Sequence, residues 1–383
     1  MHFEVGESGR LLLRDGDSTL AEYIYAPSDA TVESPRPYFL LRTRQGVEVT
    51  AYRPDDHVWH KGLSLALPNV GPHNFWGGPT YVRDQGYVQL PNNGSQVHTA
   101  FVASDTPIAD AAAGLARVDE ILDWRSQDGD PVLTEQRILT ARAVGDDAWA
   151  LTWRSALVNV SPDPLAFGSP TSKGRENAGY AGIFWRGASG WTGGAILGPG
   201  GDAGDAACGE PGPWLAFVAP DSSAGVLALA ATPADSPWFA RSAEYAGLSP
   251  APFFTDETVV EPGGTVVLSA AFIIGGADVA SLAATVGANL VAELRAVPDA
   301  EPTPATTAPD AEPRGAETDR DAELEGAAPV PDAELRGTET HRGAEPPVAD
   351  PDPDAAFHPD RADTDPAPAA EDSAPADHPE ESA

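Results

Sequence analysis

The chain has 383 residues, with 58 Asp and Glu against 23 Lys and Arg, and a net charge of −35 at pH 7. This acidity argues against nucleic-acid binding, which needs a basic surface, and the single cysteine, Cys208, excludes a disulfide framework and a cysteine-based zinc site. The N-terminus lacks the pattern of a signal peptide, and the best apolar run, residues 266–277, is shorter than the ~20 residues that span a bilayer. We therefore expect a cytoplasmic protein without a membrane partner.

Composition changes sharply near Pro298. Residues 298–383 hold 24 Asp and Glu against five Arg, and Phe357 is their only aromatic residue. Such a segment cannot bury enough apolar surface to offset the entropy lost on ordering. We predict one domain over residues 1–297 and a disordered acidic tail, rich in Pro and Ala, over residues 298–383.

The tail contains a repeat with a period of eleven residues. Asp-Ala-Glu or a degenerate Gly-Ala-Glu begins at five positions: Asp299, Asp310, Asp321, Asp332 and Gly343. The units lack an apolar stripe and several contain proline, which favours a solvated low-complexity array over a helical supercoil. Such an array would serve as a solubilising spacer or as an arm for a protein partner.

Short alternating segments fill the predicted domain. Residues 3–26 predict consecutive hairpins, and residues 38–43 and 47–50 predict another around Gly46. Further strands are predicted at 97–104, 115–125, 132–143, 148–159, 214–219, 226–232, 238–245 and 265–274. Four large apolar residues of the segment 148–159 recur at period two and should share one face: Trp149, Leu151, Trp153 and Leu157.

One helix is predicted late in the domain, from Asp278 as the N-cap to Leu294. Its apolar residues recur at helical spacing: Val279, Leu282, Val286 and Leu290. Many short strands and one late helix predict an all-β fold, a large antiparallel β-sandwich with a C-terminal helix.

The stretch 52–98 is the first candidate for function. It holds four of the eight histidines, two of the nine tryptophans and one of two lysines, which is unusual for loops that only fill space. His57 and His60 stand three apart, so both could face one cavity from a turn and act in proton transfer. Lys61 adds a cation beside them. The competing interpretation is that His57 bonds Asp55 or Asp56 and fixes the loop.

A metal site is an alternative for the same histidines, with His73 or His98 as a third ligand and a nearby acid. We predict no cofactor and keep this metal site as the less favoured interpretation. Rings and amides of the stretch would bind a sugar by stacking and hydrogen bonding, or would fill core and turns instead. The ligand-binding candidates here are Trp59, Asn74, Trp76, Tyr81, Gln89, Asn93 and His98.

Two later stretches add polar groups. Residues 168–186 include Arg175, which could bind a carboxylate or sugar oxygens, and Glu176, a candidate base. The competing interpretation is a surface ion pair between these two. Within residues 168–186, Trp185 is a further ligand-binding candidate. Residues 236–241 add Trp238 and Arg241 as candidates.

These stretches resemble a bacterial family labelled "methane oxygenase PmoA". The resemblance rests on Asp-His-Val-Trp-His-Lys-Gly-Leu at 56–63, on residues 74–82 and 85–89, on residues 169–171, 174–175 and 178–186, and on Pro-Trp-Phe at 237–239 with Arg241. It covers about residues 36–275. One departure is Leu40-Leu41, where the family usually has His-Pro-Leu between Phe and Arg.

The family label implies a subunit of a membrane copper methane monooxygenase, but this sequence has no membrane helix. We therefore interpret the label as a misnomer. The resemblance otherwise implies a galactose-mutarotase-like β-supersandwich and a link to carbohydrates, and the missing histidine near Leu40 bears on any activity that needs it.

We predict a carbohydrate-active enzyme, an epimerase/mutarotase or a lyase/hydrolase acting on a sugar or sugar acid. His57 or His60 would be the general acid, Glu176 or another acid the base, and Arg175 and Lys61 would stabilise negative charge. The alternatives are a glycan-binding module without turnover and an oxygenase with a histidine-bound metal. All three require the first two stretches to meet in space.

Overall fold

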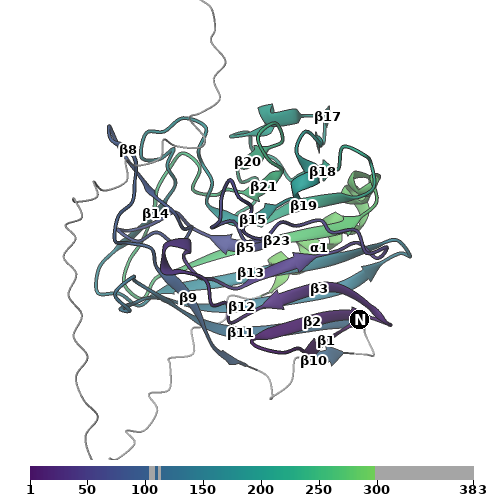
Figure 1. The fold of residues 1–383 in the computed structure, drawn as a ribbon, viewed down its shortest axis with the longest axis horizontal. Coiled ribbons are helices and arrows are strands. Elements are labelled where there is room, and N and C mark those ends of the chain that lie inside the picture. The colour runs from purple at the N-terminus through teal and green to yellow at the C-terminus, as the bar shows by residue number, and fades with distance from the viewer. Residues whose placement is uncertain (103–107, 111–113, 298–383) are drawn as a thin grey trace, which may run out of the picture. The chain divides into compact units, whose positions relative to one another are not determined.

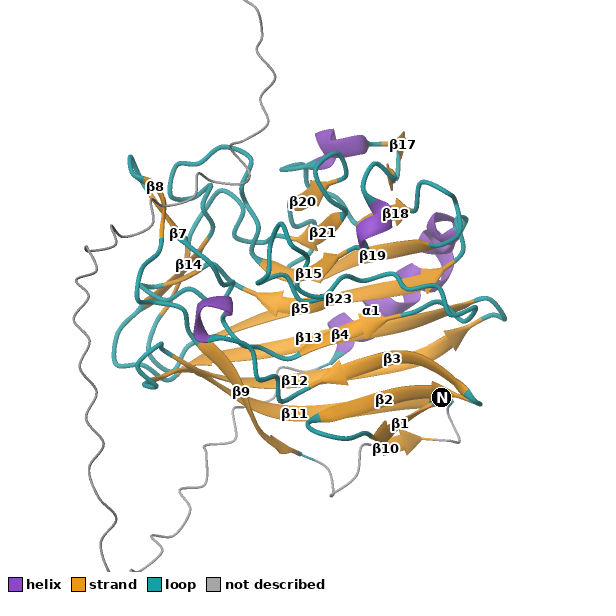
Figure 2. Ribbon diagram, viewed as in Figure 1, coloured by secondary structure: helices purple, strands orange, loops and turns teal. Residues whose placement is uncertain are grey.

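Alternating strands organise the chain into two large antiparallel sheets (Figures 1 and 2). The computed structural model describes residues 1–102, 108–110 and 114–297, so the predicted tail and its repeat lie outside the described residues. The first sheet has eight strands, in the order β1 (His2–Val5), β2 (Arg10–Asp15), β3 (Ser18–Ile24), β4 (Tyr38–Leu41), β5 (Leu63–Ala66), β15 (Gly182–Arg186), β21 (Gly247–Pro250) and β20 (Trp238–Arg241).

The second sheet has ten strands. Its order is β10 (Ile108–Asp110), β11 (Leu115–Arg125), β12 (Pro131–Val144), β13 (Ala148–Asn159), β23 (Thr265–Gly275), β19 (Gly225–Thr232), β18 (Trp214–Val218), β16 (Ala195–Gly198) and β17 (Gly201–Asp202), and β9 (Ser95–Phe101) also pairs with β11. A three-stranded sheet joins β22 (Thr258–Val260), β14 (Leu165–Gly168) and β6 (Asn69–Val70), and β7 (Thr80–Val82) pairs with β8 (Gly86–Val88).

The main core lies between the two large sheets. All four residues predicted to share a face of β13 belong to it: Trp149, Leu151, Trp153 and Leu157. The opposite face of β13 is covered as well, because Ala148 and Ala150 pack in a second cluster with Leu290 and Leu294. The predicted antiparallel sandwich with one C-terminal helix is therefore confirmed.

The helical segment differs in detail from the prediction. A 3₁₀ turn (Val279–Leu282) and a π turn (Ala283–Gly287) precede α1 (Ala288–Ala296). Three further 3₁₀ turns lie at Thr31–Glu33, Ser189–Trp191 and Gly204–Ala207. No helix in the described ranges has the length and apolarity needed to cross a bilayer.

Two strand predictions were wrong in extent. Residues 47–50 form only an isolated bridge, Arg42 to Glu48, because the N–H of Leu41 donates to the Thr50 hydroxyl at 2.9 Å and not to a backbone carbonyl. The strand predicted at 238–245 ends at Arg241, since the next two backbone N–H groups donate to the carboxylate of Asp205.

Candidate functional site

The first sheet carries rings and charges on the face turned away from the second sheet. Because side chains alternate along a strand, Trp185 and Leu248 face the main core, whereas their neighbours on β15 and β21 face outward. The outward rings form a separate buried cluster, with Trp59 and Cys208 packed against it: Trp76, Tyr180, Phe184, Phe239, Tyr245 and Phe254. We call these rings, together with the polar side chains that contact them, the outer-face cluster.

Two histidines of the first stretch pack against these rings. The rings of His57 and His60 lie 4.5 Å apart and nearly parallel, at 9°. His60 also contacts Trp76 and Phe184, with centroids 5.6 and 5.1 Å away. Both histidines contact Tyr245, at 5.4 and 5.5 Å. The first two candidate stretches therefore meet, as the shared-site hypothesis requires.

Arg186, at the end of β15, connects the charged groups. Its Nη1 lies 3.1 Å from His60 Nδ1, its Nη2 donates to Asp56 Oδ2 at 2.7 Å, and its guanidinium lies 4.1 Å over the Tyr245 ring. His57 Nδ1 lies 3.1 Å from the same Asp56 oxygen. Since a guanidinium has only donors, His60 Nδ1 accepts and His60 Nε2 carries the proton.

The surroundings set the charge states of this group. Burial lowers the pKa of His60 well below its usual value, and the nearby His57 and Arg186 lower it further, so His60 is neutral near pH 7. Partial burial of Asp56 raises its carboxyl pKa, but hydrogen bonds from His57 and Arg186 more than offset this and hold the pKa below its usual range. Asp56 is therefore ionised.

One donor in this arrangement is unsatisfied. Arg186 Nε is buried and has no hydrogen-bond partner within the described residues, and the Arg186 side chain is only 6% exposed. Leaving a buried donor unpaired costs about 1–3 kcal/mol. The outer-face cluster thus lacks one acceptor.

A turn of two glycines lets the loop within residues 52–98 pack closely against Trp59. Gly77 and Gly78 have φ of 105° and 66°, and a Cβ on Gly78 would lie 2.8 Å from the Trp59 ring. The Asn74 amide holds this turn, since its Oδ1 accepts from the backbone N–H of Trp76 and Gly77 at 2.8 and 3.0 Å. Asn74 therefore positions Trp76 and is itself 1% exposed.

The remaining amide candidates support the same loop. Asn93 Nδ2 donates to Gly78 O at 2.9 Å, and Gln89 Nε2 donates to Asn93 Oδ1 at 2.6 Å. Tyr81 lies across the β7–β8 hairpin from Tyr87, with ring centroids 5.6 Å apart. These side chains are part of the scaffold beneath the rings.

Arg175 reaches the outer-face cluster through two tyrosines. Its Nη1 donates to the Tyr87 hydroxyl and its guanidinium lies 4.7 Å over that ring. The hydroxyls of Tyr87 and Tyr180 are 2.7 Å apart, and the Tyr180 ring lies 4.4 Å from Trp76. Glu176, the predicted base, is exposed beside Arg175.

Arg241, at the end of β20, lies on the same face. Its guanidinium is 4.9 Å over Phe239 and its Nη2 donates to Asn177 O at 2.5 Å. Burial lowers the pKa of Arg241, but Cys208 and Tyr245 more than offset this and raise it. The third candidate stretch therefore also meets the outer-face cluster.

Four predicted residues lie elsewhere. Lys61 is fully buried, and its Nζ pairs with Glu33 and with Asp29 at 3.1 Å. His98 Nδ1 lies 2.7 Å from Glu120, inside the sandwich. Trp185 and Trp238 belong to the main core, where their indole N–H groups donate to backbone carbonyls at 3.0 and 2.9 Å.

The metal alternative finds no ligand set in the described ranges. No group of three or more His, Cys, Asp or Glu residues there is arranged to hold a metal ion. His73 and His98, the suggested third ligands, are separated from the histidine pair: His98 pairs with Glu120, and His73 lines a cavity of its own.

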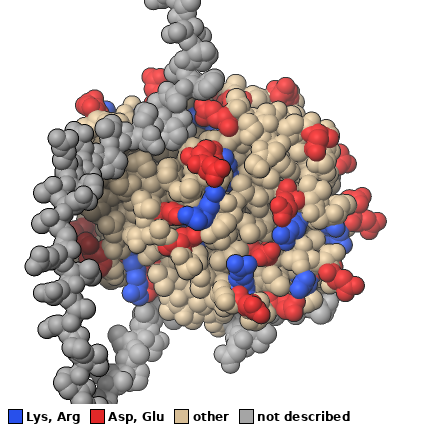
Figure 3. Space-filling view, in the orientation of Figure 1, with Lys and Arg blue, Asp and Glu red and all other residues tan. Residues whose placement is uncertain are grey.

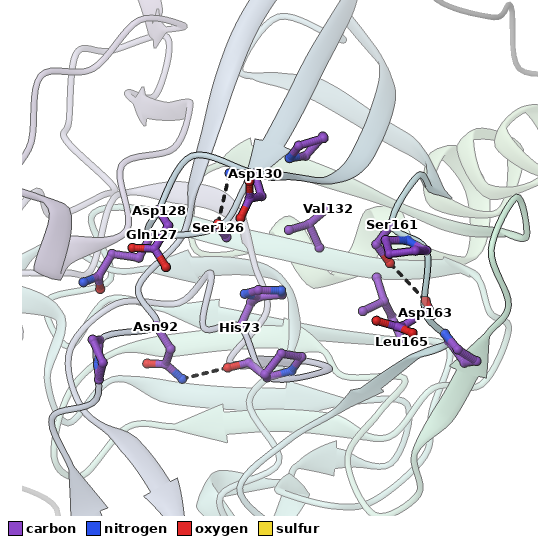
Figure 4. A pocket seen from close by; sticks show the side chains of 15 residues that line it. His73, Asn92, Ser126, Gln127, Asp128, Asp130, Val132, Ser161, Asp163 and Leu165 are labelled. Carbon is purple, nitrogen blue, oxygen red and sulfur yellow. Dashed lines mark hydrogen bonds between the residues drawn. The ribbon is translucent and has the colours of Figure 1, made fainter.

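That cavity has a volume of about 350 Å³ and is walled by four loops (Figure 4). His73 and Asn92 lie on one side of it, where Asn92 Nδ2 donates to Pro72 O at 3.0 Å. Burial lowers the pKa of His73. Carboxylates and prolines form much of the rest of the wall: Asp128, Asp130, Asp163, Pro91, Pro131, Pro162 and Pro164.

The distribution of surface charge does not single out the outer-face cluster or the cavity beside His73. On the face shown in Figure 3, basic and acidic side chains lie next to one another rather than in separate fields. This matches the many Arg–carboxylate pairs of the first sheet, such as Arg14 with Glu4 and Arg42 with Glu22.

Sequence reasoning missed several residues of the outer-face cluster. Tyr180 and Arg186 stand within the candidate stretches, and period two along 182–186 places Phe184 and Arg186 on one face. The sequence therefore contained a signal for Phe184 and Arg186. Asp56 was named only in the interpretation in which it bonds His57 and fixes the loop, and it does lie 3.1 Å from His57 Nδ1. Tyr245 and Cys208 lie outside the resembling motifs, and cross-strand packing alone brings them in.

Comparisons with known proteins point to a family but not to an activity. A family model described as "Family of unknown function (DUF6807)" matches residues 10–285. No curated protein matches the chain. Among solved structures, the Slr1438 protein from Synechocystis sp. PCC 6803 is similar with a TM-score of 0.34 and 11% identity, over 70% of this chain and 95% of that one.

Proposed function

The chain belongs to the family of unknown function DUF6807, and we propose that it is a carbohydrate-active enzyme with its active site at the outer-face cluster. The reaction is an epimerisation/mutarotation or a lyase/hydrolase reaction on a sugar derivative, in the cytoplasm. The resemblance of residues 56–63 and 178–186 to a family with a galactose-mutarotase-like fold supports this assignment.

One observation carries the proposal. Three segments far apart in sequence place rings, two arginines and an Asp–His pair on one sheet face. Aromatic faces bind the C–H faces of sugars, and charged groups beside them bind hydroxyls. Trp59 is only partly buried, which makes it the first ring that a sugar would meet.

The geometry supports different roles for the two histidines in this proposal. His57 Nδ1 lies 3.1 Å from the Asp56 carboxylate, and an imidazole beside a carboxylate can give and take a proton near neutral pH, so we assign proton transfer to His57. His60 is neutral and accepts from Arg186, so its role is to position that guanidinium. Arg186 would stabilise the negative charge that develops on a sugar oxygen.

A binding screen followed by kinetics tests this function. The full chain is screened against neutral and acidic sugars by isothermal titration calorimetry, and turnover of each bound sugar is followed by NMR. His57→Ala should reduce kcat by roughly 100-fold or more with a small change in affinity. His73→Ala is the matched control, since His73 lines the separate cavity, and should leave kcat unchanged.

A binding module is the second candidate, and the burial of the cluster favours it. His60 is 1% and Tyr245 5% exposed, which suits a rigid platform as well as a catalytic centre. A sugar that binds but is never converted, with His57→Ala changing only its affinity, would establish the module and reject the enzyme. If no sugar binds, both fail.

A further inference from the structure

Two arginines of the outer-face cluster lie in one row across three strands. Arg186 on β15 pairs with Gly247 on β21, and Gly247 pairs with Arg241 on β20. Residues directly opposite in antiparallel strands point to the same side, so both arginines face outward. Neighbouring strands are about 4.8 Å apart, which places the two backbones about 10 Å apart.

A side chain at the middle position of the row would be crowded. A Cβ on Gly247 would lie 3.0 Å from the Tyr245 ring and 3.2 Å from the Phe184 ring. The row is therefore covered by rings and has no side chain between the arginines. Tyr245 stacks with Arg186 and is also close enough to Arg241 to raise its pKa.

Both guanidiniums stack on rings by their faces, and their edges are partly engaged: Arg186 Nη1 and Nη2 contact His60 and Asp56, which leaves its Nε. Arg186 stacks on Tyr245 and Arg241 on Phe239. A guanidinium has five N–H donors. Arg186 Nε is buried without a partner in the described part of the chain, and Arg241 is satisfied mainly by two backbone carbonyls, at Asn177 and Ala240.

The nearby carboxylates do not explain this arrangement. Asp56, which pairs with Arg186, is 41% exposed, and Glu244, 3.9 Å from Arg241, is 46% exposed. Exposed ion pairs contribute little, yet the Arg186 side chain is 6% exposed. Ion pairing within the described residues therefore leaves Arg186 Nε–H without an acceptor.

We propose that the row Arg186–Gly247–Arg241 binds the carboxylate of the substrate, so that the enzyme acts on uronic acids. This inference rests on the proposed function and narrows it to one substrate class. The carboxylate accepts from Arg186 Nε–H and from Arg241 Nε–H, which lies 3.9 Å from Glu244 Oε2, with the sugar ring over the rings of the cluster. Planar guanidinium groups match planar carboxylates in this way.

A carboxylate fits better than a phosphate for electrostatic reasons. Residues 1–297 hold 34 acids against 18 bases, so the domain as a whole repels anions. A carboxylate adds one negative charge, whereas a phosphate monoester carries close to two near pH 7. Two arginines already paired in part can balance the first more readily than the second.

Titration calorimetry with the full chain tests this inference. The probes are galacturonate and glucuronate, their neutral parents galactose and glucose, and glucose 6-phosphate. We expect at least one uronate to bind roughly tenfold more tightly than its parent. Arg241→Gln should remove this preference, and denaturant unfolding of the variant, whose arginine is only 20% exposed in the unchanged protein, checks that the chain remains folded.

A control and three outcomes make the result decisive. Arg125→Gln, an exposed arginine on the other sheet, should keep the preference for the uronate. Neutral sugars that bind as well as uronates overturn the carboxylate row but leave the proposed function standing. Tighter binding of glucose 6-phosphate overturns the choice of carboxylate. Absence of binding by any sugar overturns the proposed function itself.

Discussion

The protein buries two charged clusters, one between its sheets and one on the outside of the first sheet. The inner network joins both sheets: Tyr23, Gln96, His98, Glu120, Trp124, Glu135, Arg137 and Ser155. The outer-face cluster groups Asp56, His57, His60 and Arg186 with aromatic rings. Both contain a buried arginine, a histidine and a carboxylate.

The inner network is saturated. Arg137 Nε and Nη2 donate to Glu135 at 2.7 and 2.8 Å, Nη1 donates to Tyr23 at 3.1 Å, and Nη2 also donates to Gln96 at 3.0 Å. Burial lowers the pKa of Arg137, but Glu135 and Tyr23 more than offset this and raise it. None of its buried nitrogen and oxygen atoms in the described ranges lacks a partner.

The outer-face cluster differs in three respects. One donor, Arg186 Nε, has no partner among the described residues, Asp56 is 41% exposed, and the ring of Trp59 is only partly buried. A saturated network fixes a fold, and each unsatisfied group in a native protein needs an explanation. The comparison favours a structural role for the inner network and agrees with the ligand binding that we propose for the outer-face cluster.

The largest expected effect comes from breaking the inner network. Arg137→Leu leaves Glu135 buried without a cation, which should lower the free energy of unfolding by about 3–5 kcal/mol. Denaturant unfolding measures it. Arg125→Leu is the control, because its pair with Asp123 is exposed and should contribute at most about 1 kcal/mol. Equal losses in the two variants would show that the network is not structural.

A smaller effect on the free energy of unfolding is expected from replacing His60, and this effect depends on pH. Its folded-state pKa is lowered, so below the unfolded value of about 6.5 the unfolded chain binds a proton that folded His60 does not. Stability therefore falls as pH decreases from about 6.5, by at most ~1.4 kcal/mol per pH unit. In His60→Asn this slope should be shallower between pH 6.5 and 5, with His73→Asn as the control for a histidine outside the cluster.

The same slope in His60→Asn and in the unchanged protein would contradict this account of His60. It would mean that the imidazole is charged in the folded state, and that Arg186 does not donate to it. Urea unfolding at pH 7, 6 and 5 gives the three points needed.

Local pattern predicted most of the fold. The strand predicted at 148–159 has the same bounds in the structure, because its large apolar residues recur at period two and leave little ambiguity. The inner network was not predicted, because its polar residues interrupt the same period-two pattern. Glu135 and Arg137 occupy inward positions of β12 between Leu133 and Leu139, where a polar residue normally indicates the outward face.

The site was predicted in part. The sequence analysis expected the first two stretches to meet, and His60 contacts Phe184 as that hypothesis requires. It did not predict that Lys61 pairs with Glu33 and Asp29. His60 and Lys61 are adjacent and turn to different surroundings, and no period applies to the irregular chain before β5. Arg241 and Tyr245 join the cluster through the register of β15, β21 and β20, which residues distant in sequence determine.

The smallest effect on stability is expected from Asp56, and it separates the two clusters most sharply. Its folded-state pKa is lowered, so it stabilises the fold above the unfolded pKa of about 3.9 and ceases to do so as pH falls below that value. Because the carboxylate is 41% exposed, Asp56→Asn should cost less than about 1 kcal/mol at pH 7, and less still at pH 3.

Turnover should respond very differently to the same change. Asn cannot hold His57 in the required protonation state, so kcat on the bound sugar should fall by roughly 100-fold or more. Denaturant unfolding and kinetics on one preparation give both values, with Asp123→Asn as the exposed control on the other sheet. A loss of stability as large as that of Arg137→Leu would instead show that Asp56, like the inner network, mainly stabilises the fold.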